Sequence, residues 1–296
     1  MPITASVGRW GKNNPLDVLT VETLLARHRR WLDPMPALTP DSICNPATIA
    51  AIERFQTSAC ALEPARADGV VAPRGFVIDQ LERGSIPKPR HAVFTPMSWY
   101  RPVGGLTRAD FAAAALSLAC EVEAIEAVAT QEAGDRGPWD ECGRPTILFE
   151  RHKFAKHSGG RFNATHPDIS NPNSGGYGRY RVQYDKLRRA AILNETAALK
   201  AASWGTFQIL GENHAACGFG SVDAFVESML QSEAAHLAAF TAFVRADPNL
   251  RKALQDRNWT RFAMLYNGPQ YKKNAYDTKM AAHYAQLKAR RPAAVR

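Results

Sequence analysis

Glu132 is the acidic residue whose position is best suited to acid catalysis. It completes an apolar stripe of Ile125, Val128 and Ala129 that follows the 3.6-residue period of a helix, and Gly134 is a predicted C-cap. Burial without a cation disfavours an ionised carboxylate and raises its pKa, and the negative end of a helix dipole acts in the same direction. A glutamate that stays protonated near neutral pH is able to act as a general acid.

The same pattern also fits a structural role. Glu121 lies on the same stripe, so stripe position alone does not identify an acid. A frayed helix end with Glu132 in water is the alternative interpretation. Glu123 and Glu126 fall off the stripe, which predicts that both are solvated.

The first 85 residues predict a compact domain of three helices. The first helix follows Asn14-Pro15, and the second begins at Asn45-Pro46, an N-cap followed by proline. Asp68-Gly69 predicts a turn, Pro73 is expected to open the third helix, and Gly84 to end it. A unit of this size has little room for a deep catalytic pocket, which favours a binding module.

The rest of the chain predicts a linker and a larger domain. Residues 86–106 are rich in proline and glycine and are expected to be a linker. Thr107 and Asp110 resemble a capping box at the start of a domain that covers 107–296. That domain is predicted to be helical, with an irregular loop at 157–181, so the fold class is mainly α.

Three segments of the first domain carry a family resemblance. They read SVGRWGKNNPLDVLTVETLL (6–25), NPATIAAIERFQ (45–56) and DGVVAPRG (68–75). Together they resemble the three-helix peptidoglycan-binding domain found at the ends of many wall hydrolases, and the resemblance covers about residues 6–84. A generic helical bundle is the alternative.

Four motifs of the second domain carry a second resemblance. Glu132-Ala-Gly is followed by GRPTILFERH (143–152), SWGTFQILGENHAACGF (203–219) and LYNGPQYKKNAYDTKMAAHYA (265–285). In this order they resemble a phage endolysin-type N-acetylmuramidase of the lysozyme superfamily, over about residues 107–288. The resemblance implies a lysozyme-like α+β domain with a small β-hairpin region and Glu132 as the catalytic glutamate. Ala133 departs from the serine that often follows that glutamate.

The resemblance also implies a cleft for sugars. Its predicted substrate-binding residues offer rings, amides and a hydroxyl: Ser203, Trp204, Gln208, Tyr266, Asn267, Tyr271 and Tyr276. For Trp204, as for Phe207, core packing is the alternative. Gln208 stands in an apolar run, where a buried amide requires hydrogen-bond partners.

Glu150 is a second candidate catalytic residue with two possible roles. It follows the strand-like run Ile147–Phe149 and would assist water or stabilise an oxocarbenium ion, or instead pair with an arginine and hold the hairpin. Three other functions stay open. They are a lytic transglycosylase that forms 1,6-anhydro products, a type VI secretion effector, and a non-catalytic wall-binding protein, which the Ala133 departure favours.

Composition limits the expected partners and location. The net charge of +9 fits attraction to anionic wall or outer-membrane polymers, or general solubility, and we expect no nucleic-acid partner and no membrane insertion. The N-terminal residues hold no apolar stretch of signal-peptide length. We therefore expect an endolysin held in the host cytoplasm until release and acting in the periplasm on peptidoglycan. An immunity protein is expected only for a secretion effector.

Cysteine and histidine spacing gives no sign of a metal site or cofactor. The five cysteines form no CxxC pair and the eight histidines form no HExxH motif. Cytoplasmic synthesis favours free thiols, with a Cys44–Cys60 bridge after export as the alternative.

Overall fold

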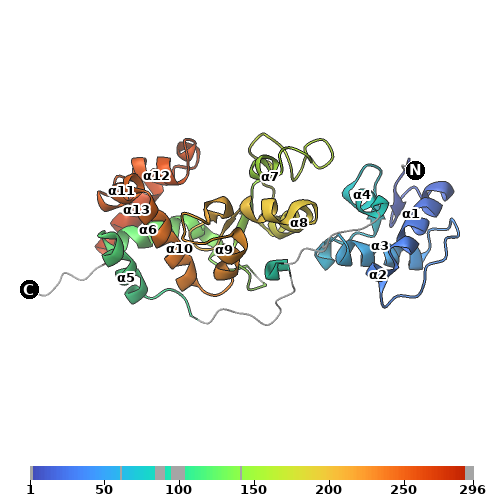
Figure 1. The fold of residues 1–296 in the computed structure, drawn as a ribbon, viewed down its shortest axis with the longest axis horizontal. Coiled ribbons are helices and arrows are strands. Elements are labelled where there is room, and N and C mark those ends of the chain that lie inside the picture. The colour runs from blue at the N-terminus through green and yellow to red at the C-terminus, as the bar shows by residue number, and fades with distance from the viewer. Residues whose placement is uncertain (1–2, 61, 84–90, 95–103, 141, 291–296) are drawn as a thin grey trace, which may run out of the picture. The chain divides into compact units, whose positions relative to one another are not determined.

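The computed structural model describes residues 3–60, 62–83, 91–94, 104–140 and 142–290 (Figure 1). The described residues are mainly helical with two small antiparallel sheets, which confirms the predicted fold class. Most of the predicted linker 86–106 lies outside the described residues. The chain forms two compact units, residues 1–90 with 151–198 and residues 91–150 with 199–296. They divide the chain differently from the predicted domains, because residues 151–198 join the first unit.

The N-terminal part of the first unit contains the three predicted helices and a two-stranded sheet. Its elements are β1 (Val7–Gly8), α1 (Pro15–Arg27), α2 (Arg29–Leu32), α3 (Pro46–Ser58), η1 (Pro64–Arg66), β2 (Val70–Val71) and α4 (Phe76–Glu82). The Asn45 side chain accepts bonds from two backbone N–H groups of α3, which confirms the predicted N-cap. The third helix begins at Phe76 rather than Pro73, because Arg74 has a left-handed backbone with φ 57°.

Residues 151–198 complete the first unit with α7 (Arg151–His157), η4 (Tyr180–Val182) and most of α8 (Gln183–Lys200). Ile192 is buried in the same core cluster as Val21 and Phe55. The buried Asp185 of α8 pairs with Arg66 at 3.0 Å, and Arg188 pairs with Glu63 at 2.8 Å. The N-terminal helices therefore share a core and ion pairs with α8.

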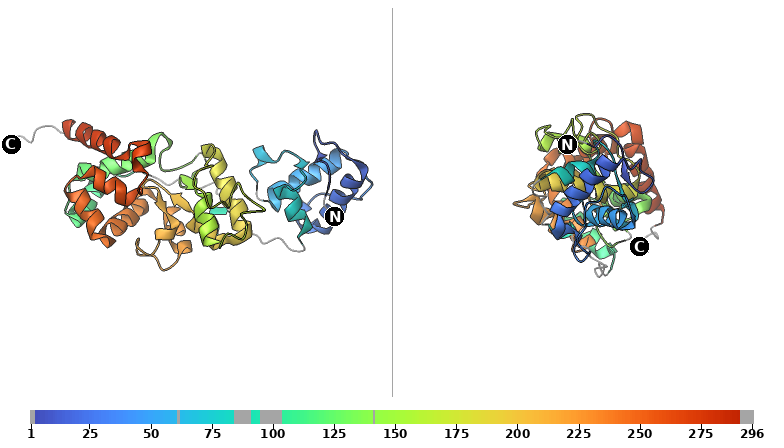
Figure 2. Two further views of the ribbon diagram at one scale, coloured as in Figure 1. Left: turned by 90° about the horizontal axis from the view of Figure 1, so that it is seen from above. Right: turned by 90° about the vertical axis from the view of Figure 1, so that its right-hand side faces the viewer.

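The second unit is a set of helices around a small sheet. Its elements are η2 (Ala92–Phe94), α5 (Arg108–Leu118), α6 (Val122–Ala133), η3 (Gly134–Arg136), β3 (Ile147–Phe149), β4 (Ala202–Trp204), β5 (Ile209–Leu210), η5 (Gly211–Asn213), α9 (Val222–Met229), α10 (Glu233–Ala246), α11 (Pro248–Gln255), α12 (Trp259–Tyr266), η6 (Tyr271–Asn274) and α13 (Tyr276–Ala289). Helix α13 lies along α6, and α5 packs against both α6 and α10 (Figure 2). Thr107 and Asp110 make both bonds of the predicted capping box at the start of α5.

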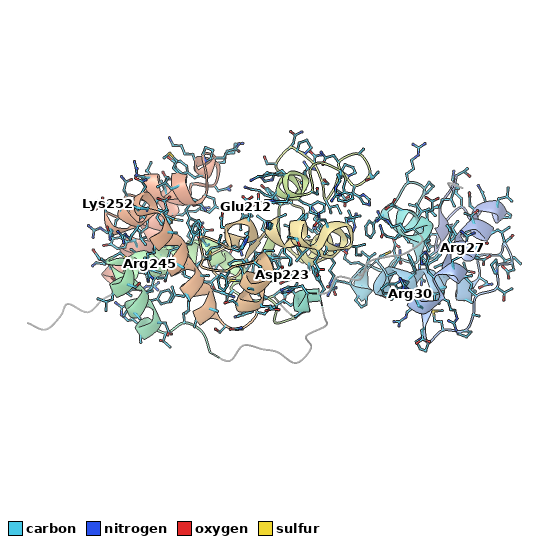
Figure 3. The ribbon with its side chains drawn as sticks, in the orientation of Figure 1. Arg27, Arg30, Glu212, Asp223, Arg245 and Lys252 are labelled. Carbon is cyan, nitrogen blue, oxygen red and sulfur yellow. The ribbon has the colours of Figure 1, made fainter. Side chains whose placement is uncertain are left out.

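The sheet of the second unit brings distant motifs together. Strand β4 lies between β3 and β5 and is antiparallel to both, with Ile147 opposite Trp204 and Ser203 opposite Leu210. The segment Ser203–Leu210 is therefore a β-hairpin in its own right. Exposed basic side chains occur in both units, among them Arg27 and Arg30 in the first and Arg245 and Lys252 in the second (Figure 3).

Candidate active site

Glu132 lies in the last turn of α6 with only 7% of its surface exposed. Ile125, Val128 and Ala129 on the same face are also buried, which confirms the predicted stripe. Gly134 caps the helix at φ 52°, a conformation that glycine adopts without strain. The alternative of a solvated helix end is therefore wrong.

The surroundings of Glu132 favour its neutral form. Burial raises the pKa of its carboxyl to about 7, although a bond from Asn267 and the positive charge of Arg136 lower the pKa in part. The Asn267 amide donates to Glu132 Oε1 at 2.9 Å from the C-cap of α12. Near pH 7 a large share of the molecules therefore carries a protonated glutamate, as a general acid requires.

Two tyrosines lie within electrostatic range of this carboxylate. Burial raises the pKa of Tyr266 well above its usual value, and the charge of Glu132 raises it further. The pKa of Tyr276 is also raised, by burial first and then by Glu132, with a smaller contribution from Glu150. The structure thus brings together Glu132, Tyr266, Asn267 and Tyr276. The charge of Glu150 also acts on the pKa of Tyr276.

Gln208 braces the hairpin turn between β4 and β5. Its side-chain N–H groups donate to the carbonyls of Thr146 at 3.1 Å and Gly205 at 2.8 Å, and its oxygen accepts from Ser203 Oγ at 3.3 Å. Gln208 also has a left-handed backbone with φ 48°. The amide of Gln208 is half-buried, and protein groups bond both its nitrogen and its oxygen.

Tyr266 joins α12 to the same turn. Its hydroxyl donates to the carbonyl of Phe207 at 2.6 Å, and its ring stacks on Phe262 with centroids 5.3 Å apart. Phe207 in turn stacks on Phe240 of α10 at 4.3 Å. The hairpin turn is therefore attached to the helix that places Asn267 beside the acid.

Several predicted substrate contacts lie in the core instead of on a surface. Trp204 is 1% exposed and its indole N–H donates to the carbonyl of Leu199, so it packs as the alternative interpretation expected. Ser203 and Tyr271 are also buried, at 5% and 6% exposure. These three side chains are largely buried, whereas Tyr276 is half-buried.

His236 is a residue of this region that sequence reasoning missed. It accepts from the Thr206 backbone N–H at Nδ1 (3.2 Å) and donates from Nε2 to the Met229 carbonyl (2.8 Å). The Trp139 ring lies 4.9 Å from its ring. Burial lowers the pKa of His236 to about 4, so it is a neutral support beneath the hairpin turn. A single histidine within an alanine-rich helix carries no spacing signal that would have revealed this role.

Gly205→Ala is expected to destabilise the protein by about 2 kcal/mol or more. A Cβ at Gly205 would lie 2.7 Å from His236 Nδ1. Gly137→Ala is the matched control, because Gly137 has nearly the same φ (70° against 69°) with nothing within 4 Å of its Cβ position. Thermal unfolding compares the two variants. Equal losses in Tm would show that the contact with His236 does not require glycine.

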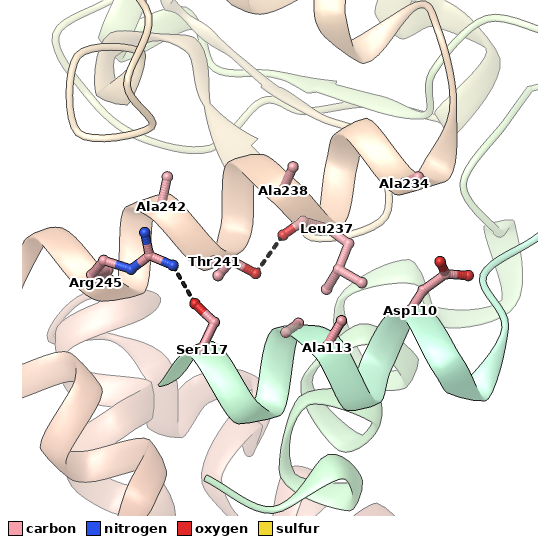
Figure 4. A pocket seen from close by; sticks show the side chains of 10 residues that line it. Asp110, Ala113, Ser117, Ala234, Leu237, Ala238, Thr241, Ala242 and Arg245 are labelled. Carbon is pink, nitrogen blue, oxygen red and sulfur yellow. Dashed lines mark hydrogen bonds between the residues drawn. The ribbon is translucent and has the colours of Figure 1, made fainter. Parts of the chain in front are cut away.

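A separate pocket of about 360 Å³ lies between α5 and α10 (Figure 4). Alanines form much of its lining, and Arg245 donates to the hydroxyl of Ser117 at one end. Glu132 is not among its lining residues. The pocket thus reflects helix packing between small side chains and is separate from the candidate acid.

The described part of the chain holds no cluster of three or more histidines, cysteines or acids that could bind a metal. All five cysteines are free thiols, Cys44 and Cys60 included. Within the same described ranges, no helix is both long and apolar enough to cross a bilayer.

The prediction that Glu123 of α6 is solvated was wrong. Glu123 is 2% exposed, and Arg108 of α5 bonds its carboxylate at 2.7 Å. Arg108 also pairs with Glu126, which is half-buried. Both acidic residues therefore help to join α5 to α6.

Residues 121–288, more than half of the chain, match the family model of N-acetylmuramidase. The chain therefore belongs to the N-acetylmuramidase family and is a glycoside hydrolase that acts on peptidoglycan. It is similar to the crystal structure of the Burkholderia AP3 phage endolysin, with 32% identity, a TM-score of 0.57, and coverage of 92% of this chain and 96% of that chain. These findings confirm the predicted endolysin-type muramidase. No protein with a curated description matches the chain.

Proposed function

We propose that this chain is a phage endolysin that hydrolyses the β-1,4 bond between N-acetylmuramic acid and N-acetylglucosamine, with Glu132 as the general acid. One observation carries the proposal: Glu132 is 7% exposed, and burial raises its pKa to about 7. A carboxyl group of this kind holds a proton at the pH of a bacterial cell and is able to release it to a leaving group.

The bond to Asn267 also suggests which oxygen of Glu132 carries that proton. Glu132 Oε1 accepts from the amide, which favours the proton on Oε2. The proton passes to the glycosidic oxygen as the bond to the anomeric carbon breaks. Water then supplies the hydroxyl that completes hydrolysis, and the remaining proton returns to the glutamate. Glu150, whose charge helps to raise the pKa of Tyr276, is the candidate for stabilising the sugar cation or directing the water.

The rest of the proposal concerns binding and delivery. We assign wall binding to the N-terminal helices of residues 1–85, and the charge of +9 would support contact with anionic wall or outer-membrane polymers. The protein would stay in the cytoplasm of the host bacterium until release and then act in the periplasm. A type VI secretion effector would instead be encoded beside an immunity protein.

Mass spectrometry of digested wall tests the reaction. We expect products that end in reducing muramic acid from the unmodified chain, and far fewer from Glu132→Gln. Glu150→Gln should reduce the rate if Glu150 assists the sugar cation, and should leave the rate unchanged if the side chain only holds the hairpin. Products that end in 1,6-anhydro-muramic acid would show that the reaction is transglycosylation and not hydrolysis, because that ring forms without water.

A further inference from the structure

Trp10 is almost completely exposed in the turn that joins β1 to α1. Its side chain is 94% exposed, the highest value among the exposed large hydrophobic residues of the described chain. Its backbone has φ 61°, a left-handed conformation that favours glycine over a bulky residue. A large ring in water on an unfavourable backbone conformation contributes nothing to the core, so its position calls for another explanation.

The turn that carries Trp10 is rigidly held. The Gly8 N–H donates to Asn13 Oδ1 at 2.8 Å, and the Asn13 side chain donates back to the Gly8 carbonyl at 3.1 Å. The Gly11 N–H donates to the Gly8 carbonyl at 3.0 Å, and Arg9 pairs with Glu53 of α3. The ring is therefore presented from a fixed base, which reduces the entropy lost when a ligand binds.

The bonding of the turn indicates which ligand it suits. The backbone N–H groups of residues 8, 9, 11, 12 and 13 all have acceptors within the protein. An added peptide strand would need free backbone partners, and the turn offers few. It offers instead the flat face of an indole, whose negative quadrupole attracts the weakly positive C–H groups on the face of a pyranose ring.

We propose that Trp10 is a binding contact of the N-terminal helices, against which a sugar ring of the peptidoglycan glycan strand stacks. This assignment rests on the proposed wall-binding function of these helices and adds the contact residue and the part of the wall that it binds. The ring would leave water on binding, and a single buried aromatic often supplies a large share of an affinity.

Sedimentation with purified wall sacculi tests the contact. The full-length Glu132→Gln chain is used as the parent, so that the wall is not digested during the measurement. Trp10→Ala should weaken binding about tenfold, while Trp10→Phe, which keeps a ring, should recover most of the affinity. Leu16→Ala is the matched control, because Leu16 is also exposed, at 79%, and lies just after the same turn. It should bind as the parent does.

Competition then identifies the ligand. Oligomers of N-acetylglucosamine should displace the parent from sacculi, and an isolated stem peptide should not. Displacement by the peptide alone would overturn the assignment to the glycan, as would a Trp10→Ala chain that binds like its parent. The Tm of Trp10→Ala should match that of the parent, since the ring makes few contacts, and a clear drop would show that the ring is structural.

A last measurement separates this inference from the proposed function. In the active chain, Trp10→Ala should lyse sacculi more slowly than the unmodified chain, while Leu16→Ala should lyse them at the unmodified rate. Failure of the unmodified chain to cleave wall glycan would overturn the proposed reaction. Equal lysis of sacculi by Trp10→Ala and the unmodified chain would overturn only the role of Trp10.

Discussion

Glu132→Gln is expected to lower wall lysis by about 10²- to 10⁴-fold, the contribution typical of a general acid, without weakening wall binding. Glutamine has nearly the same shape as glutamic acid and retains hydrogen-bonding ability toward Asn267, but it has no proton to release to the glycosidic oxygen. Loss of turbidity of a wall suspension measures lysis, and sedimentation with sacculi measures binding. Substantial lysis by this variant would remove Glu132 from the proposed mechanism.

Glu121→Gln is the control from the same helix. Glu121 shares the stripe of Glu132 in the sequence but bonds Arg257, Tyr284 and Lys288 at the opposite end of α6. The Lys288 bond is the main cause that lowers its pKa, so it is an ionised structural residue. Lysis by Glu121→Gln should therefore be close to that of the unmodified chain.

The pH profile gives an independent test of the same acid. The unmodified chain should lose activity as the pH rises through about 7, because Glu132 then gives up the proton that catalysis requires. Asn267→Ala removes a bond that stabilises the carboxylate, so the pKa of Glu132 should rise and the alkaline loss of activity should move to higher pH. An Asn267→Ala profile that does not move would show that a group other than Glu132 controls the alkaline loss of activity.

The sequence was most informative where short-range chemistry determines structure. The N-cap at Asn45 and the capping box at Thr107 depend on residues within one helical turn, and both were predictable from residue types. The buried stripe that ends at Glu132 depends only on helical period. The predicted start of α4 was wrong, by contrast, because the residue type of Arg74 does not indicate its left-handed backbone.

Long-range contacts determine what the sequence did not reveal. Arg108 reaches the buried Glu123 from another helix, and Trp204 is buried in β4, the central strand of its sheet. His236 supports a turn thirty residues away in sequence. Such pairings depend on which elements meet in space, and one sequence without its relatives does not show that.

Long-range contacts also determine that residues 151–198 belong to the first unit. Residue 151 follows directly after Glu150, just past the end of β3, and α8 leads into β4, which contains Ser203. Both ends of residues 151–198 are therefore connected along the chain to strands of the candidate site. Between these ends, Asp185 and Ile192 pack with the N-terminal helices. The N-terminal helices are thus part of the framework that holds this segment, in addition to any role in wall binding.

Glu132→Gln should also stabilise the folded protein at alkaline pH, by about 3 kcal/mol. The pKa of Glu132 rises from 4.5 to about 7 on folding, so below 4.5 both states are protonated and the shift has no effect. As the pH rises through this window the unfolded chain ionises first, and folding becomes less favourable until the folded carboxyl also ionises. Glutamine does not titrate and avoids this loss.

Thermal unfolding at about pH 4 and about pH 8 measures this effect, because the difference in Tm between the variant and the unmodified chain should appear mainly at the higher pH. Glu121→Gln should change Tm in the opposite direction at about pH 8, since Glu121 has a lowered pKa and its ion pairs stabilise the fold only when it is ionised. A Glu132→Gln difference that is equal at both pH values would mean that the carboxyl titrates normally. Its burial at the end of α6 would then have another purpose than holding a proton for catalysis.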